Sequence, residues 1–344
     1  MKPIAIVGGG LAGLTLGIGL RQRGVPVMIC EAGHYPRHRV CGEFINGGGQ
    51  DVLSRLGLMG GLVKAGAVPA RTAAFISESS HSPVRSLPQH GLCLSRFTLD
   101  ALLAREFTKL GGDLREGKRW DEDECEAGVV RASGRRLQPI EDGWRWFGLK
   151  VHAGKVRLMA DLEMHLALNG YVGMCRLNHE QVNVCGLFRR SLRDKETVRG
   201  WRELLLGVPG TMVHERLAKA EFDESSFCSV AGLSLRSQGA SAQTECCIGD
   251  TITMIPPVTG NGMSMAFESA ELAIEPMAGY SREELTWSEA KLAIACACDR
   301  AFRRRLRWAR WLQWMMFTPR LQNRLGTLAL RSGWLWQLLF AKTR

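Results

Sequence analysis

The sequence predicts an α/β fold: a three-layer domain around a parallel sheet, with an inserted antiparallel-sheet domain and a helical C-terminal segment. Three observations predict it. A glycine-rich turn at residues 8–13 joins a buried strand to a helix, residues 141–240 alternate polar with apolar side chains, and the composition becomes basic and Trp-rich from residue 299. A chain of 344 residues is long enough for one large core or two intertwined ones.

Residues 1–31 have the pattern of a Rossmann-type βαβ unit. An apolar run ends at Val7, helical spacing follows from Leu11 to Arg23, and a second apolar run covers residues 25–30. Between the first strand and the helix lies a GxGxxG match, Gly8-Gly9-Gly10-Leu11-Ala12-Gly13.

This turn is suited to a dinucleotide. Gly8 allows the tight turn, Gly10 lets a pyrophosphate approach the backbone, and Gly13 lets helix and strand pack closely. The N-terminus of the helix supplies N–H donors to the phosphates. Glu31, 18 residues beyond Gly13, is placed to accept hydrogen bonds from ribose hydroxyls. NAD fits this unit as well as FAD does, so the rest of the chain must distinguish them.

A second glycine-rich segment lies far downstream. An apolar approach leads to Gly249-Asp250, and then to Pro256-Pro257-Val258-Thr259-Gly260-Asn261-Gly262-Met263 at the start of a helix expected over residues 263–277. A proline-stiffened turn that opens a helix is again an anion-binding layout. The segment resembles the second flavin motif of the FAD-dependent hydroxylase superfamily. The resemblance implies FAD, with Asp250 on the ribityl chain and the helix N-terminus (Gly260, Asn261, Gly262, Met263) facing the isoalloxazine ring.

Two further stretches resemble this superfamily. Residues 94–103 are similar to its RxxLDxxL stretch, which implies that Arg96 approaches the FAD phosphates; an ion pair with Asp100 one helical turn later is the alternative. Residues 36–44 resemble the basic-x-Cys-Gly stretch of the geranylgeranyl-reductase-like branch, which implies that Arg39 and Cys41 lie at the flavin. Cys41 could equally be a small buried apolar residue. Glu43, in the same stretch, is expected to be a structural ion-pair partner rather than a proton donor.

These matches predict three regions. The FAD-binding domain comprises residues 1–66, 91–140 and 241–287; a substrate-binding sheet comprises 67–90 and 141–240; the helical segment is 288–344. In the sheet, alternation predicts antiparallel strands with one solvated face. Residues 112–136 are charge-rich and predict an exposed hairpin.

The net charge of +11 belongs to the C-terminal segment. Residues 299–344 carry 11 basic residues and one acid, whereas the other 298 carry 34 and 33. A protein body that is nearly neutral excludes nucleic-acid binding over its whole surface. At helical spacing five arginines share a face with two tryptophans: Arg300, Arg303, Arg304, Arg307, Arg310, Trp311 and Trp314. We expect either peripheral contact of residues 299–344 with an anionic membrane, or a helix packed on the flavin domain with a solvated arginine face.

The cysteines and the N-terminus indicate a cytoplasmic protein, with the inner membrane face as the site of any peripheral contact. Eleven cysteines form no CxxC pair, no histidines lie at metal-ligand spacing, and no secretory signal precedes the first strand. We therefore predict no metal site. No run of about 18 apolar residues occurs, so no spanning helix is expected.

The function predicted is an FAD-dependent monooxygenase (hydroxylase) acting on a small apolar substrate of aromatic, polyketide or isoprenoid type. A C=C reductase of geranylgeranyl-reductase type is the alternative, and a non-catalytic FAD-binding membrane protein is the second. No second GxGxxG is present, so NAD(P)H would dock only transiently as reductant, or another flavoprotein would supply the electrons. No residue stands out as the catalytic acid or base. Trp144-Arg145-Trp146 is similar to a halogenase W-x-W, but the Ile-Pro that should follow is absent, so halogenation is not expected.

Overall fold

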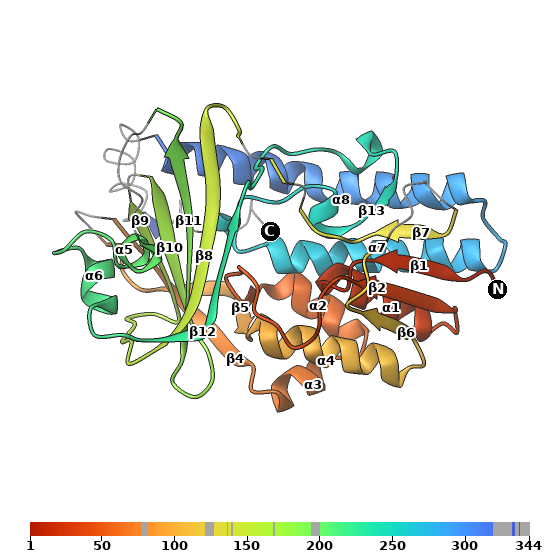
Figure 1. Cartoon of the computed structure of the whole chain (residues 1–344), viewed down its shortest axis with the longest axis horizontal. Helices are drawn as coiled ribbons and strands as arrows, with labels where there is room; N and C mark the ends of the chain where they lie inside the picture. The colour runs from red at the N-terminus through yellow and green to blue at the C-terminus, as the bar shows by residue number, and fades with distance from the viewer. Residues whose placement is uncertain are drawn as a thin grey trace.

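The structure, a computed structural model, consists of two sheets side by side, with the longest helix running along one side of the parallel-sheet domain (Figure 1). It describes residues 1–77, 81–120, 127–135, 137–138, 140–167, 169–193 and 200–318, together with Ser332, Gly333 and Gln337. The α/β fold class predicted from the sequence is confirmed.

The parallel sheet has five strands in the order β13-β7-β1-β2-β6. Their bounds are β1 Ile4–Val7, β2 Val27–Glu31, β6 Asp113–Glu116, β7 Val129–Arg131 and β13 Cys246–Cys247. All neighbouring pairs are parallel. The central strands are buried on both faces, which is why they appear in the sequence as continuous apolar runs.

The hairpin expected over residues 112–136 is wrong. β6 pairs with β2 and β7 pairs with β1, so β1 and β2 lie between the two strands. The charge of this region has another cause. β6 is the edge strand and most of its residues are exposed, and charged side chains on an edge discourage pairing with another chain.

Among the described residues, five helices belong to this domain: α1 Leu11–Arg21, α2 Gly47–Arg55, α3 Met59–Lys64, α4 Arg96–Lys109 and α7 Gly262–Ser281. α1 packs against both α4 and α7 and is buried from Leu11 to Leu20. The contact with α7 is close at Gly19, where a Cβ would lie 2.3 Å from Ile274 Cδ1. This contact joins the first and last parts of the parallel-sheet domain.

The second sheet has eight strands in the order β12-β8-β11-β10-β9-β4-β5-β3. Their bounds are β3 Phe44–Ile45, β4 Val68–Ile76, β5 Arg85–Cys93, β8 Trp144–Gly154, β9 Leu162–Ala167, β10 Gly170–Arg176, β11 Val182–Ser191 and β12 Glu221–Ala231. The pairs are antiparallel except for β4 with β9, which is parallel. Short helices α5 (Trp201–Leu206) and α6 (Met212–Leu217) cover one face of it.

The expectation that the other face is solvated is wrong at β8. Val151 and Ala153 pack in the core beneath α5 and α6. Lys150 and His152 alternate with them and are also buried, because residues 38–44 lie against that face. Alternation shows that a strand has two different faces, but not that the polar one meets water.

The C-terminal helix α8 (Trp287–Met316) begins with a capping box formed by Thr286 and Glu289. Its apolar side packs on the parallel-sheet domain through α7 and the 3-10 turn η1 (Ala240–Ala242). For residues 299–316, the packed helix with a solvated arginine face is therefore what the structure shows. Residues 319–331, 334–336 and 338–344 of the predicted segment lie outside the described residues. Among those that are described, no helix has the length and apolar character to cross a bilayer.

Candidate functional site

A cavity of about 730 Å³ lies at the carboxyl ends of the parallel strands. Val7, Glu31, Ala132 and Ile248 line it, and each of these residues ends or directly follows one of four neighbouring strands. Ligands of open parallel sheets bind at this edge. The volume is in the range of cofactor and ligand sites.

Most of the residues predicted for the flavin site line this one cavity: Gly8, Gly10, Leu11, Ala12, Glu31, Arg39, Cys41, Arg96, Asp250, Gly260, Gly262 and Met263. Gly13 and Asn261 lie behind the wall. A Cβ on Gly13 would lie 2.0 Å from the carbonyl oxygen of Gly8, so Gly13 permits the close packing of helix and turn. Asn261 is buried and accepts a hydrogen bond from the side chain of Asn46.

Gly8 and Gly10 of the first glycine-rich turn have different surroundings. Gly8 has a φ of +106°, and a Cβ there would lie 2.5 Å from the carbonyl oxygen of Ala132. Gly10, the residue before α1, has an extended backbone, and a Cβ there would meet no heavy atom within 4 Å. Gly8 is therefore required by the fold, while Gly10 leaves open space at the N-terminus of a helix.

Glu31 is held in place by the turn it faces. Its carboxylate accepts hydrogen bonds from Gly9 N and Gly33 N, both at 2.9 Å, and Arg37 lies 2.7 Å away. Burial acts to raise the pKa of Glu31, but the hydrogen bond and charge of Arg37 and the Gly33 N–H outweigh it and lower the pKa. Arg37, which the sequence analysis did not select, is closer to Glu31 than Arg39 is, at 3.7 Å.

The second motif forms the opposite wall. The chain passes through two 3-10 turns, η2 (Gly249–Thr251) and η3 (Pro257–Thr259), and enters α7 after Gly260, which is left-handed with φ +64°. Asp250 is half-buried at the cavity. Burial raises its pKa, although the positive charges of Arg135 and Arg96 act in the opposite direction.

Arg96 forms the ion pair that was the alternative in the sequence. Its Nε and Nη2 donate to the two carboxylate oxygens of Asp100 at 2.6 and 2.8 Å. Burial alone would lower the pKa of Arg96, but Asp100 raises it. Because Arg96 also lines the cavity, the ion pair fixes a cation at the cavity wall.

The electrostatics of the cavity suit a dinucleotide. Six basic side chains line it (Arg37, Arg39, Arg96, Lys118, Arg119 and Arg135), against three acids (Glu31, Glu43 and Asp250). Among the described residues, Arg39 Nε and Trp120 Nε1 are buried donors without a hydrogen-bond partner. Unpaired donors, excess positive charge and an open helix N-terminus together match a pyrophosphate. The residues present therefore fit FAD.

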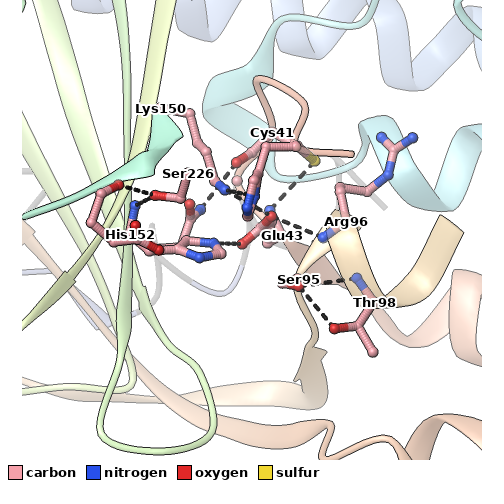
Figure 2. A network of polar contacts seen from close by, with 12 residues as sticks. Cys41, Glu43, Ser95, Arg96, Thr98, Lys150, His152 and Ser226 are labelled. Carbon is pink, nitrogen blue, oxygen red and sulfur yellow. Dashed lines mark hydrogen bonds and ion pairs between the residues drawn. The ribbon is translucent and has the colours of Figure 1, made fainter. Parts of the chain in front are cut away.

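A buried polar network connects this cavity to the second sheet (Figure 2). Glu43 Oε2 accepts from His152 Nε2 at 2.7 Å, and Glu43 Oε1 lies 3.4 Å from Lys150 Nζ and accepts from Arg96 N at 2.8 Å. Lys150 Nζ also donates to His38 Nδ1 at 2.9 Å. The expectation that Glu43 is an ion-pair partner agrees with this geometry, whereas Lys150, His152 and His38 were missed.

The network has a defined charge pattern. Burial acts to raise the pKa of Glu43, but His152 and Lys150 lower it, so the carboxylate is held as an anion. Burial, with the charges of Lys150 and His152, lowers the pKa of His38 to about 4. Glu43, His38 and His152 bring three ligand atoms within 4.8 Å of one another. Lys150 already supplies the positive charge there, so we assign no metal to this cluster.

Comparison with known proteins agrees with this site. Residues 1–138 match the family described as FAD binding domain. Conditioned medium factor receptor 1 of Dictyostelium discoideum is 28% identical over 125 residues, which are 33% of this chain and 24% of that protein. The chain thus spans about a quarter of the length of that relative.

Solved structures resemble the chain over nearly its whole length. A flavoprotein/dehydrogenase from Cytophaga hutchinsonii has a TM-score of 0.73 at 14% identity, covering 93% of this chain and 87% of that one. PqsL, a probable FAD-dependent monooxygenase from Pseudomonas aeruginosa, has a TM-score of 0.69 at 14% identity, covering 93% and 98%. The flavin-dependent brominase Bmp2 has a TM-score of 0.74 at 16% identity, covering 100% and 95%.

The fold is the one seen in solved FAD-dependent monooxygenases and halogenases, and the cavity fits FAD. The match to the FAD binding domain family covers residues 1–138, about two fifths of the chain. At these identities the solved structures establish the fold and not the reaction.

Gly10→Val should abolish FAD retention and leave the protein folded. A Cβ at this position would have no neighbouring heavy atom within 4 Å, and the branched side chain would extend into the space left for the pyrophosphate. The flavin absorbance of purified protein measures retention, and circular dichroism measures the fold. Gly60→Val is the matched control, because Gly60 is exposed on α3 and also has no neighbour within 4 Å. Stoichiometric flavin in folded Gly10→Val protein would falsify the assignment.

Asp250→Ala should lose mainly FAD affinity, whereas Glu43→Ala should lose mainly stability. Loss of a hydrogen bond to the Asp250 carboxyl should weaken FAD binding by about 1.5–3 kcal/mol, or about 10- to 150-fold. Loss of Glu43 leaves Lys150 buried without its counter-charge, which should lower the free energy of unfolding by about 3–5 kcal/mol. Fluorescence titration with FAD and thermal unfolding separate the two effects. Equal losses of affinity without a loss of stability would contradict this ranking.

Acidification should destabilise the protein first through His38. Its pKa is 6.5 ordinarily and about 4 in the folded state, so between these values the unfolded chain binds a proton that the folded chain does not. The contribution of His38 to the free energy of unfolding is therefore fully present above pH 6.5 and is lost as the pH drops toward 4. Glu43, with its lowered pKa, adds a loss below its ordinary value of 4.5. His38→Gln keeps an acceptor for Lys150 but does not titrate, so its melting temperature should fall less between pH 6.5 and 4.5. If the melting temperatures of the wild-type and His38→Gln proteins fell equally with pH, this role of His38 would be refuted.

Proposed function

We propose that the protein is an FAD-dependent monooxygenase that hydroxylates a small apolar substrate of aromatic, polyketide or isoprenoid type. The observation that carries the proposal is the apolar part of the cavity wall, formed by Phe44, Met254, Ile255 and Pro257 beside the second motif. Bound FAD, once reduced, activates dioxygen for transfer to a substrate. The chain contributes by binding, orienting and excluding water.

Two of the three acids that line the cavity support this division of labour. Glu31 is engaged with Arg37 and backbone N–H groups, and Glu43 with Lys150 and His152. Both have lowered pKa values, so neither holds a proton to donate at neutral pH. The chemistry proposed here depends on a shielded site more than on a protein acid.

One observation favours a second candidate, a C=C reductase. Cys41 lines the cavity, and burial raises the pKa of its thiol although Arg96 acts in the opposite direction. The thiol is then protonated at neutral pH. A reductase of this kind needs a proton for the carbon that does not receive hydride, and Cys41 is placed to supply it.

The reductant proposed is NAD(P)H, bound only while it transfers electrons. The chain has one GxGxxG unit. The N-terminus of α1, which follows this unit, faces the cavity assigned to FAD. A nicotinamide nucleotide would therefore need a different, short-lived contact.

Anaerobic reduction with NADPH or dithionite, followed by stopped-flow mixing with oxygenated buffer, tests the proposal. A monooxygenase should give an absorbance transient before flavin reoxidation, and its lifetime should lengthen with an apolar substrate. A reductase should reoxidise with an alkene under anaerobic conditions, and Cys41→Ala should slow that step while Cys93→Ala, a buried cysteine outside the cavity lining, should not. Direct reoxidation by oxygen without a transient, unaffected by substrate, would reject the monooxygenase.

A further inference from the structure

The outward face of α8 is strongly basic and also aromatic. Arg300, Arg303, Arg304, Arg307 and Arg310 are exposed there, and none of them forms an ion pair with any residue that the structure describes. On the same stretch, Trp311 is 44% and Trp314 59% exposed. An exposed indole has an apolar body and a polar N–H, which suits the boundary between water and lipid.

The apolar face of the helix is already occupied. Phe302, Leu306, Ala309 and Met316 are buried against the rest of the protein. α8 therefore cannot turn this stripe toward lipid without unpacking. The part that remains available for a partner is the arginine and tryptophan face.

A recess of about 310 Å³ lies beside this face, between α8 and residues 237–253. Arg303, Arg307 and Arg310 line it. Ser237 Oγ, which also lines it, is buried and has no hydrogen-bond partner among the described residues. Three guanidinium groups and an unpaired hydroxyl are the groups that bind a phosphate.

The one acid in the recess is already engaged. The carboxylate of Asp299 accepts hydrogen bonds from Ala240 N at 2.6 Å and from Ser241 N and Oγ at 3.2 and 2.6 Å. Asp299 thus fixes the loop that forms the far wall of the recess. Its single negative charge is outnumbered by the three arginines.

We propose that the outward face of α8 docks the protein on a membrane that contains anionic phospholipid. A lipid headgroup phosphate occupies the recess, and Trp311 and Trp314 enter the interface. Charge complementarity carries the choice of partner: the positive charge of the chain is concentrated in residues 299–344, while the rest of the chain is nearly neutral. Such an asymmetry orients the protein as it approaches a negative surface.

Co-sedimentation of the full, flavin-loaded chain tests the proposal. The vesicles contain phosphatidylcholine alone or phosphatidylcholine with phosphatidylglycerol, at low and high salt. We expect binding only to the vesicles with phosphatidylglycerol, weakened by salt because exposed charges are screened. A residual, salt-resistant part should disappear in Trp311→Ala/Trp314→Ala.

The arginine variants locate the contact. Each arginine at an anionic surface contributes about fivefold to partitioning, so Arg303→Gln/Arg307→Gln should weaken it about 25-fold. Arg105→Gln is the matched control, because Arg105 is exposed on α4, on the other side of the parallel-sheet domain (Figure 1). Truncation is unsuitable, since it would remove the buried side of α8 as well.

Three results would overturn the proposal. The first is no binding to phosphatidylglycerol vesicles at low salt, and the second is equal loss in the Arg105 control. The third is binding of inorganic phosphate in the recess, measured by calorimetry at matched ionic strength, without any binding to vesicles. Flavin absorbance and oxygen reactivity, recorded on the same samples, should be unchanged in the α8 variants. Membrane docking and the proposed monooxygenase activity can therefore fail separately.

Discussion

One buried carboxylate, that of Glu43, ties the second sheet to the start of α4. Glu43 has a positive φ of 53°, and its backbone oxygen accepts from Leu94 N while its side chain meets Arg96 N, His152 and Lys150. Strand β5, the start of α4 and strand β8 therefore converge on a single residue, which also lines the flavin cavity. A buried ion needs all of its partners, because any one left alone is a charge in a low-dielectric medium. The same contacts of Glu43 therefore fix both the cavity wall and the junction between the two domains.

The sequence predicted the candidate site best where a short segment of backbone forms part of the cavity by itself. The turn from Gly8 to Gly13 and the segment from Asp250 to Met263 were identified from local pattern, and the structure gathers nearly all of their predicted residues at one cavity. Prediction failed where partners are distant in the chain. Lys150 and His152 have the spacing of a solvated strand face, but contact with residues 38–43 buries them. The charged stretch at β6 likewise appeared to be a hairpin, because its parallel partner β2 lies about eighty residues earlier.

The basic residues of the chain form two populations with different surroundings. In the cavity, Arg96 and Arg37 are paired with Asp100 and Glu31, so their positions are fixed before any ligand arrives. On α8, the arginines project into solvent from a helix whose other side is packed. Fixed cations suit a cofactor that must be held in one geometry, whereas exposed ones suit a fluid and chemically heterogeneous surface.

The close packing of α1 against α7 also bears on how the protein is made. The glycine-rich turn at residues 8–13 leaves the ribosome early. Helix α1, which follows it, is fully buried only when α7, some 240 residues later in the chain, is in place. Until then the side of α1 that packs on α7 faces water. β13, which closes the far edge of the parallel sheet, emerges just before α7. Cofactor capture must therefore follow translation of the entire second sheet, and a chain interrupted before β13 would carry an intact glycine turn with nowhere to hold FAD.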